Sequence, residues 1–292
     1  MQNSGVFTPQ LTADGSFTFF SAEFGEAFHS NQGARLEAEL KFVGPLQLRA
    51  KAVRGELILL DVCYGLGYNT AAALEAIWEV NPNCRVELVG LELDVTVPQA
   101  AIAHQLLKNW RDPIPELLEN LVRDRKLQNH KIQAKLLLGD ARQTLQQIHK
   151  LGLKADAIFL DPFSPPRCPQ LWTVEFLGLL ANCLKSDGLL VTYSSSAAVR
   201  NALIAVGLQI GSTVPVGRRS PGTAANLSGN ELLGISELER DYLETKAGIP
   251  YRDRTLSDTA ETIIQRRQQE QQTSPKESSS QWKKRQTQLE NK

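Results

Sequence analysis

The sequence predicts an α/β protein with a doubly wound, mostly parallel sheet. Short apolar runs alternate with segments whose apolar residues recur at helical spacing, which is typical of strands joined by helices. The first strong apolar run ends in the glycine-rich turn DVCYGLGYN. Carboxylates follow several of the later runs, at the strand ends where sheets of this class bind ligands.

The elements follow in order along the chain. The run LILLDVC at 57–63 predicts a buried strand, and residues 69–80 carry Ala, Leu, Ile and Trp at helical spacing. The run VELVGLEL at 86–93 predicts the second strand. The other predicted strands are 135–138, 156–160, 188–193 and 208–216, and the other predicted helices are 97–110, 113–126, 141–151, 172–184 and 197–206.

Length and composition limit the class of protein further. The 292 residues allow one large domain or two small ones, and the 32 Lys and Arg balance the 32 Asp and Glu. Four scattered cysteines without a CxxC pair argue against a zinc site and a disulfide framework. The start has no signal-peptide pattern and no run is long enough to span a membrane, so we expect a cytoplasmic protein with no membrane or metal partner.

Composition divides the chain into three parts. Residues 1–54 predict an N-terminal extension packed on the sheet domain, which we place at 55–261. Residues 262–292 are polar, with seven Lys and Arg against three Glu, and predict a disordered tail. A weak arm that attracts phosphates is the alternative for this tail.

The turn and the next two strand ends predict a nucleoside site. Gly65 and Gly67 allow close approach of a ligand to the backbone before a helix N-terminus. Glu92 ends the second strand, where a carboxylate can accept hydrogen bonds from ribose hydroxyls. Asp140 follows the third strand, where adenine needs an acceptor, although a helix N-cap is the alternative. Together these positions favour adenosine on a Rossmann-like sheet.

The same turn favours S-adenosylmethionine over NAD. NAD sites usually have a third glycine, and Thr70 stands there instead. A cationic sulfonium cofactor benefits from nearby carboxylates, and Asp61 precedes the turn. The predicted cofactor-binding residues are Asp61, Gly65, Gly67, Asn69, Glu92 and Asp140.

The fourth predicted strand runs into the sequence FLDPFSPP, which places Asp161 before a proline-rich loop. Prolines stiffen the loop and would hold the carboxylate where a methyl group is delivered. Such a carboxylate can hold an N–H of an acceptor amine and aim the lone pair, so Asp161 is the predicted catalytic residue. A turn aspartate that caps the loop is the alternative.

These motifs together resemble the methyltransferase domain of the MnmC family of bacterial tRNA wobble-uridine modification enzymes. The resemblance rests on GxGxN after the first strand, on FLDxFxP followed by PxLWT after the fourth, and on the strand that leads into SSSAAVR. Cys63 departs from the family's usual first glycine, and Pro162 replaces a glycine found in the bifunctional enzymes. Further similar stretches are 28–37, 216–219 and 249–253, within a total span of about 15–265.

The resemblance implies methylation of the amine of 5-aminomethyl(-2-thio)uridine in a tRNA anticodon stem-loop, with the sheet domain as the methyltransferase domain. An aminopropyltransferase-like enzyme and a non-catalytic RNA-binding methyltransferase fold are the alternatives. The expected substrate-binding residues are an aromatic wall for a flipped base, Phe163, Trp172 and Tyr193, and three phosphate contacts, Arg200, Arg218 and Arg219. Ordinary core packing is the alternative for each aromatic residue, Trp172 above all, and a solvated loop is the alternative for the arginines.

Overall fold

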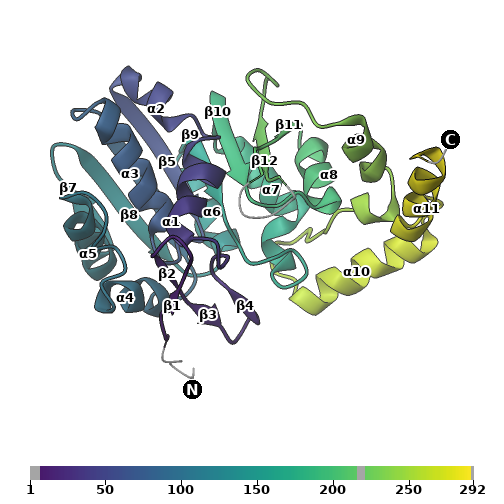
Figure 1. The fold of residues 1–292 in the computed structure, drawn as a ribbon, viewed down its shortest axis with the longest axis horizontal. Coiled ribbons are helices and arrows are strands. Elements are labelled where there is room, and N and C mark those ends of the chain that lie inside the picture. Colours follow the sequence, from purple (N-terminus) through teal and green to yellow (C-terminus); the bar gives the residue numbers. More distant parts are fainter. Residues whose placement is uncertain (1–6, 216–220, 291–292) are drawn as a thin grey trace.

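A central eight-stranded sheet organises the computed structural model, which describes residues 7–215 and 221–290 (Figure 1). The strand order is β11-β12-β10-β9-β5-β6-β8-β7, and the five strands from β10 to β8 run parallel. The predicted doubly wound, mostly parallel class is therefore confirmed. The strands are β5 (Glu56–Val62), β6 (Arg85–Glu92), β7 (Lys126–Gln128), β8 (Ile132–Leu138), β9 (Ala155–Leu160), β10 (Leu184–Thr192), β11 (Gln209–Ser212) and β12 (Thr223–Asn226).

Helices cover both faces of the sheet, because successive strand residues point to opposite sides. Leu59 of β5 belongs to the core under α3 and α5, whereas its neighbour Leu60 belongs to the core under α6, α7 and α8. The helices are α3 (Tyr68–Val80), α4 (Thr96–Ala103), α5 (Ile114–Asp124), α6 (Ala141–Lys150), α7 (Val174–Asn182), α8 (Ala197–Ala205) and α9 (Glu237–Leu243).

Two antiparallel strands were not expected from the sequence. Strand β7 has only three residues and pairs with β8, and β12 inserts between β10 and β11. The β12 sequence TAAN lacks the apolar run that marks the parallel strands. The strand order reverses at β5, because β6 lies on one side of it and β9 on the other. In open sheets ligands bind outside the carboxyl ends of the strands at such a switch point.

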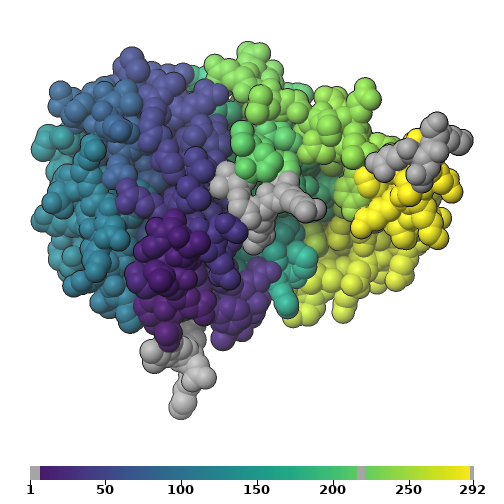
Figure 2. Space-filling model, viewed as in Figure 1, coloured from purple at the N-terminus to yellow at the C-terminus, as the bar shows by residue number. Residues whose placement is uncertain are grey.

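The N-terminal segment shares a core with the sheet. It contains β1 (Gln10–Leu11), β2 (Phe17–Thr18), β3 (Phe20–Ser21), β4 (Glu26–Ala27), α1 (Ala34–Glu37), the π-helix η1 (Ala38–Val43), α2 (Leu48–Lys51) and η2 (Ala52–Arg54). Phe19, Phe42 and Leu46 are fully or almost fully buried in the core beneath α3. Figure 2 shows this purple segment on the front of the molecule. The boundary at residue 54 stays a prediction.

The C-terminal segment differs from the expected disorder. Helices α10 (Ala260–Thr273) and α11 (Ser279–Glu290) follow each other along the yellow end of the chain in Figure 1. Thr259 caps α10 through its side chain, and Ile263 is fully buried in the core beneath α7 and α8. Arg267 donates a hydrogen bond of 2.6 Å to the carbonyl of Ile249. A polar segment orders here because its few apolar and arginine side chains contact earlier parts of the chain.

Candidate functional site

The turn after β5 has the backbone geometry that its glycines allow. Gly65 and Gly67 have φ values of 55° and 83°, in the left-handed region. A Cβ on Gly67 would lie 2.8 Å from the hydroxyl of Tyr64, so only glycine fits. Cys63 takes the same region with a φ of 68°, which costs about 1–2 kcal/mol for a residue with a side chain. Cys63 therefore adopts the same turn conformation that a glycine would, but with backbone strain.

Glu92, at the end of β6, closes this turn. Its carboxylate accepts a 2.7 Å hydrogen bond from the Gly65 N–H and a 2.9 Å bond from the Asp94 N–H. Burial raises the pKa of Glu92, and these backbone donors partly offset the shift. Each carboxylate oxygen has about two acceptor positions, so capacity remains for ribose hydroxyls.

Asp140 follows β8 and combines both expected roles. Its side chain caps α6 by accepting a 2.9 Å hydrogen bond from the Arg142 N–H. The same residue lines a cavity together with Gly65 and Glu92. Asp140 is therefore the N-cap of α6, as the alternative predicted, and its carboxylate still faces the cavity where a ligand could bind.

Asp61 and Asn69 lie elsewhere than the cofactor prediction implies. Asp61 is fully buried beneath the turn, where its carboxylate accepts a 2.7 Å bond from Thr70 and does not line the cavity. Burial raises its pKa to about 7. Asn69 donates a 2.9 Å bond to Oδ2 of Asp161, so it supports the predicted catalytic residue.

Asp161 lines the same cavity as Glu92, directly after β9. Burial raises its pKa well above the ordinary range of a carboxyl, and the Asn69 hydrogen bond opposes this shift. The nearby charge of Glu37 raises the pKa further. A carboxyl group with a raised pKa is a stronger proton acceptor when it is ionised, which suits contact with an amine.

Three side chains hold the loop that follows Asp161. Tyr193 donates a 2.9 Å bond to the carbonyl of Pro162, and Trp172 donates a 2.9 Å bond to the carbonyl of Phe163. Glu26 of β4 accepts from the N–H of Ser164 at 3.0 Å and from its hydroxyl. Trp172 is fully buried and does not line the cavity, so its expected place in an aromatic wall is corrected to a loop anchor. Tyr193 does line the cavity.

Phe163 also lines the cavity, with aromatic partners that the sequence did not indicate. Phe24 stacks on Phe163 with a centroid distance of 4.4 Å and an interplanar angle of 17°. Phe28 meets Phe163 edge-on at 5.0 Å. The aromatic wall is therefore Phe163 with two N-terminal phenylalanines, which contact it only through the folding of β3 and β4 against the loop.

Glu37 is a second carboxylate that sequence reasoning missed. It lines the cavity at the end of α1, forms a 2.6 Å ion pair with Lys41 and accepts a hydrogen bond from the Ser30 hydroxyl. Burial favours a higher pKa, but the hydrogen bonds from Lys41 and Ser30 outweigh it, so the pKa of Glu37 is lowered. The available signal was the similar stretch 28–37, which carried no assigned role.

The expected phosphate contacts are not brought to the cavity. Arg200 is 2% exposed and forms a 2.8 Å ion pair with Glu239 and a 3.0 Å hydrogen bond to Thr223. This buried arginine joins α8 to α9 and β12, so its expected phosphate contact is wrong. Arg218 and Arg219 lie outside the described residues.

One cavity of about 970 Å³ collects these groups. We call Gly65, Glu92 and Asp140 its glycine-turn side, and Asp161, Phe163 and Glu37 its Asp161 side. The volume lies at the upper end of that usual for small-molecule sites, with room for a nucleoside cofactor and an acceptor base. Carboxylate acceptors beside a glycine backbone suit the hydroxyls and cationic groups of S-adenosylmethionine, so the residues fit this cofactor.

Residues 7–215 and 221–290 contain neither a candidate metal site nor a membrane-spanning helix. No group of three or more His, Cys, Asp or Glu there could hold a metal ion. No helix there is long and apolar enough to cross a membrane.

Comparison with known proteins gives consistent matches. Residues 98–228 match the model of a family of S-adenosyl-L-methionine-dependent methyltransferases. The crystal structure of MnmC2 from Aquifex aeolicus superposes with a TM-score of 0.81 and 35% identity, covering 94% of this chain and 87% of that one. An uncharacterised protein of Methanocaldococcus jannaschii is 31% identical over 88% of this chain and 70% of its own length.

The bifunctional tRNA 5-methylaminomethyl-2-thiouridine biosynthesis protein MnmC of Ralstonia nicotianae is also 31% identical, over 75% of this chain. The match covers 34% of that protein. The chain thus spans about a third of the length of this bifunctional relative.

Proposed function

The chain belongs to the MnmC-like family of S-adenosyl-L-methionine-dependent methyltransferases, and from this premise we propose that it methylates a primary amine on a tRNA uridine. The proposed acceptor is the amine of 5-aminomethyluridine, or its 2-thio form, at the wobble position in the anticodon stem-loop. One observation carries the proposal: Asp161 shares a single cavity with the glycine turn and Glu92.

The glycine-turn side would hold the cofactor. S-adenosyl-L-methionine supplies an electrophilic methyl group on a sulfonium centre. Glu92, fixed by the backbone N–H groups of Gly65 and Asp94, would accept hydrogen bonds from the ribose hydroxyls. Gly65 would let the ligand approach the backbone closely, and Asp140 would accept from the adenine amino group.

Asp161 would act on the acceptor amine. An alkylammonium ion has no lone pair for attack, so one proton has to leave the nitrogen. In this step an N–H bond breaks, its electron pair stays on nitrogen and an O–H bond forms on Asp161. Asn69 donates a hydrogen bond to Oδ2 of Asp161 and so restrains the position of that oxygen. Orientation of this kind contributes up to about 7–11 kcal/mol in ideal cases.

Glu37 would bind the charged form of the acceptor. The pKa of Glu37 is lowered and the pKa of Asp161 is raised. Such a pair of shifts suits one carboxylate that stays ionised and binds a cation, here Glu37, and one that accepts a proton, here Asp161. Lys41 and Ser30 keep Glu37 ionised, so its negative charge attracts an ammonium group to the Asp161 side. Phe163 would offer its ring to the base, and Arg218 and Arg219 stay proposed phosphate contacts.

The test uses the purified full chain with S-adenosyl-L-methionine and tRNA that carries 5-aminomethyluridine. Mass analysis of the digested nucleosides should show conversion to the methylaminomethyl form, and tRNA with plain uridine is the control. Parallel reactions with decarboxylated cofactor and a polyamine test the aminopropyltransferase alternative. Cofactor binding without a methylated nucleoside would contradict the proposed substrate and favour a non-catalytic RNA-binding fold.

A further inference from the structure

Asp140, on the glycine-turn side, accepts several hydrogen bonds from one arginine, Arg142. Arg142 donates to its carboxylate from Nε, at 3.1 Å to each oxygen, and from Nη2 at 2.6 Å. The backbone N–H of Arg142 is a third donor and makes the fourth hydrogen bond, at 2.9 Å. A planar guanidinium fork fixes both the position and the plane of a carboxylate. The direction in which Asp140 can accept another hydrogen bond therefore depends on Arg142.

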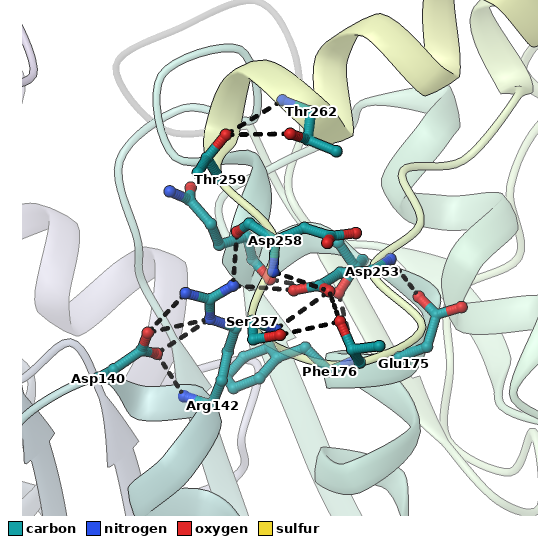
Figure 3. Close-up of polar contacts among 12 residues, drawn as sticks. Asp140, Arg142, Glu175, Phe176, Asp253, Ser257, Asp258, Thr259 and Thr262 are labelled. Atoms are coloured by element: carbon teal, nitrogen blue, oxygen red, sulfur yellow. Dashed lines mark hydrogen bonds and ion pairs between the residues drawn. The ribbon is translucent and has the colours of Figure 1, made fainter.

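Arg142 is in turn held by the C-terminal part of the chain (Figure 3). Its Nη1 donates to Asp253 at 2.8 Å and to the carbonyl of Asp258 at 2.9 Å. Asp253 is fully buried, and its other oxygen accepts from the N–H groups of Ser257 and Asp258 at 3.2 Å each. Asp253 belongs to the stretch 249–253, whose role the proposed function leaves open.

Two arginines of helix α10 donate hydrogen bonds to the backbone of the 249–253 stretch. Arg266 donates to the carbonyl of Arg252 at 2.6 Å, and Arg267 donates to the carbonyl of Ile249 at 2.6 Å. The guanidinium of Arg267 also lies 4.5 Å from the ring centre of Tyr251. An unbroken series of contacts thus runs from α10 through Asp253 and Arg142 to the cavity.

From these contacts we propose that Arg142 and Asp253 are positioning residues that aim the Asp140 carboxylate at the adenine amino group of the cofactor. The proposal rests on the proposed function for the role of Asp140. It makes the C-terminal segment a working part of the cofactor site, because Asp253 reaches Arg142 only while the 249–258 stretch is folded against α6.

The chain offers a matched control in Arg200. Both arginines are buried near the start of a helix that follows a strand, and each pairs at 2.8 Å with a carboxylate from later in the chain. Arg142 lines the cavity, and Arg200 does not. Loss of either ion pair should lower stability, but only loss of the Arg142 pair should alter recognition of adenine.

The experiment compares binding of S-adenosylhomocysteine with binding of S-inosylhomocysteine, in which oxygen replaces the 6-amino group. The full chain should bind the adenine compound about tenfold more tightly, which corresponds to about 1.4 kcal/mol. Arg142→Met and Asp253→Asn should reduce this preference to about threefold or less, and Arg200→Met should keep it. Chemical unfolding of each variant shows that the measured protein is folded.

Arg142→Lys is the second variant, since it keeps the charge and removes the fork. It should lose the preference as Arg142→Met does. A folded Arg142→Met or Arg142→Lys protein with the full preference would overturn the proposal, as would a wild-type protein without any preference. Methyl transfer to tRNA by the wild-type chain is measured separately, so failure of the substrate proposal is distinguished from failure of this one.

Discussion

The two sides of the cavity are built in different ways. The glycine-turn side comes from the carboxyl ends of adjacent parallel strands, so Gly65, Glu92 and Asp140 meet because the sheet brings them together. The Asp161 side needs a second layer, in which Glu37 and two phenylalanines of the N-terminal segment fold against the loop after β9. The sheet thus explains one side, and long-range packing explains the other.

This difference separates two tasks. The carboxylates of the glycine-turn side are fixed by backbone donors or by an arginine, which suits constant contacts to a cofactor. On the Asp161 side two carboxylates face one space with pKa values shifted in opposite directions, which suits binding and deprotonation of an amine. Variants on each side should therefore change different measured quantities.

The largest expected effect concerns Asp61, which lies beneath the glycine turn and outside the cavity. Its pKa is about 7 in the folded protein, against an ordinary 3.8. Stability from this group is complete below pH 3.8 and is lost as the pH rises to about 7, on the order of 4 kcal/mol at about 1.4 kcal/mol per pKa unit. Asp61→Asn should lack this loss.

Urea unfolding of wild type and Asp61→Asn between pH 4 and pH 8 measures the difference. A difference in unfolding free energy that does not change across this range would show that Asp61 is ionised throughout.

Asp161→Asn should reduce the rate of methyl transfer by about tenfold to a hundredfold, the cost of one charge-assisted contact of about 1.5–3 kcal/mol. The amide keeps the shape but cannot accept a proton from the amine. Single-turnover methylation of aminomethyl-tRNA gives the rate. Transfer at the wild-type rate would remove Asp161 from the reaction.

Glu92→Ala should weaken cofactor binding by about tenfold, since two hydroxyl contacts to a charged acceptor are lost. Titration calorimetry with S-adenosylhomocysteine measures the affinity. Glu87→Ala is a control on the same strand, because this residue does not line the cavity. Equal affinities for Glu92→Ala and the control would exclude Glu92 from the cofactor site.

Glu37→Gln should raise the KM for aminomethyl-tRNA by about fivefold, or about 1 kcal/mol, and leave cofactor affinity unchanged. The effect is smaller because Lys41 already neutralises part of the Glu37 charge. Glu37→Gln combined with Lys41→Met restores a neutral pair and serves as the folding control. If both proteins weaken cofactor binding and leave KM unchanged, Glu37 belongs to the cofactor instead.

The sequence predicted much of the fold, the glycine-turn side of the cavity and part of its Asp161 side. The family, the enzyme class, the cofactor class and the mostly parallel sheet are confirmed. Glycines in a turn and carboxylates after apolar runs are local patterns, so Gly65, Glu92 and Asp140 could be placed without knowledge of distant contacts. The place of Asp161 in the cavity could be predicted in the same way, from its position after a strand, and its catalytic role stays a prediction.

The remainder depends on contacts between distant parts of the chain. Asn69 follows the glycine turn in sequence, yet its amide reaches Asp161, 92 residues later. Trp172, for which core packing was the alternative, and Arg200, expected at a phosphate, are both buried and act as structural anchors. Helix α10 has few apolar residues, and its order comes from arginines that bond to the backbone of the 249–258 stretch. Composition alone does not reveal such contacts.

The most direct test of the division between the two sides measures cofactor affinity and single-turnover methylation for Glu92→Ala and Asp161→Asn together. We predict that Glu92→Ala lowers affinity and keeps most of the rate at saturating cofactor. We predict that Asp161→Asn keeps the affinity within a few fold and loses the rate. Two variants that lower both quantities to the same degree would contradict the division, because they would show one undivided site.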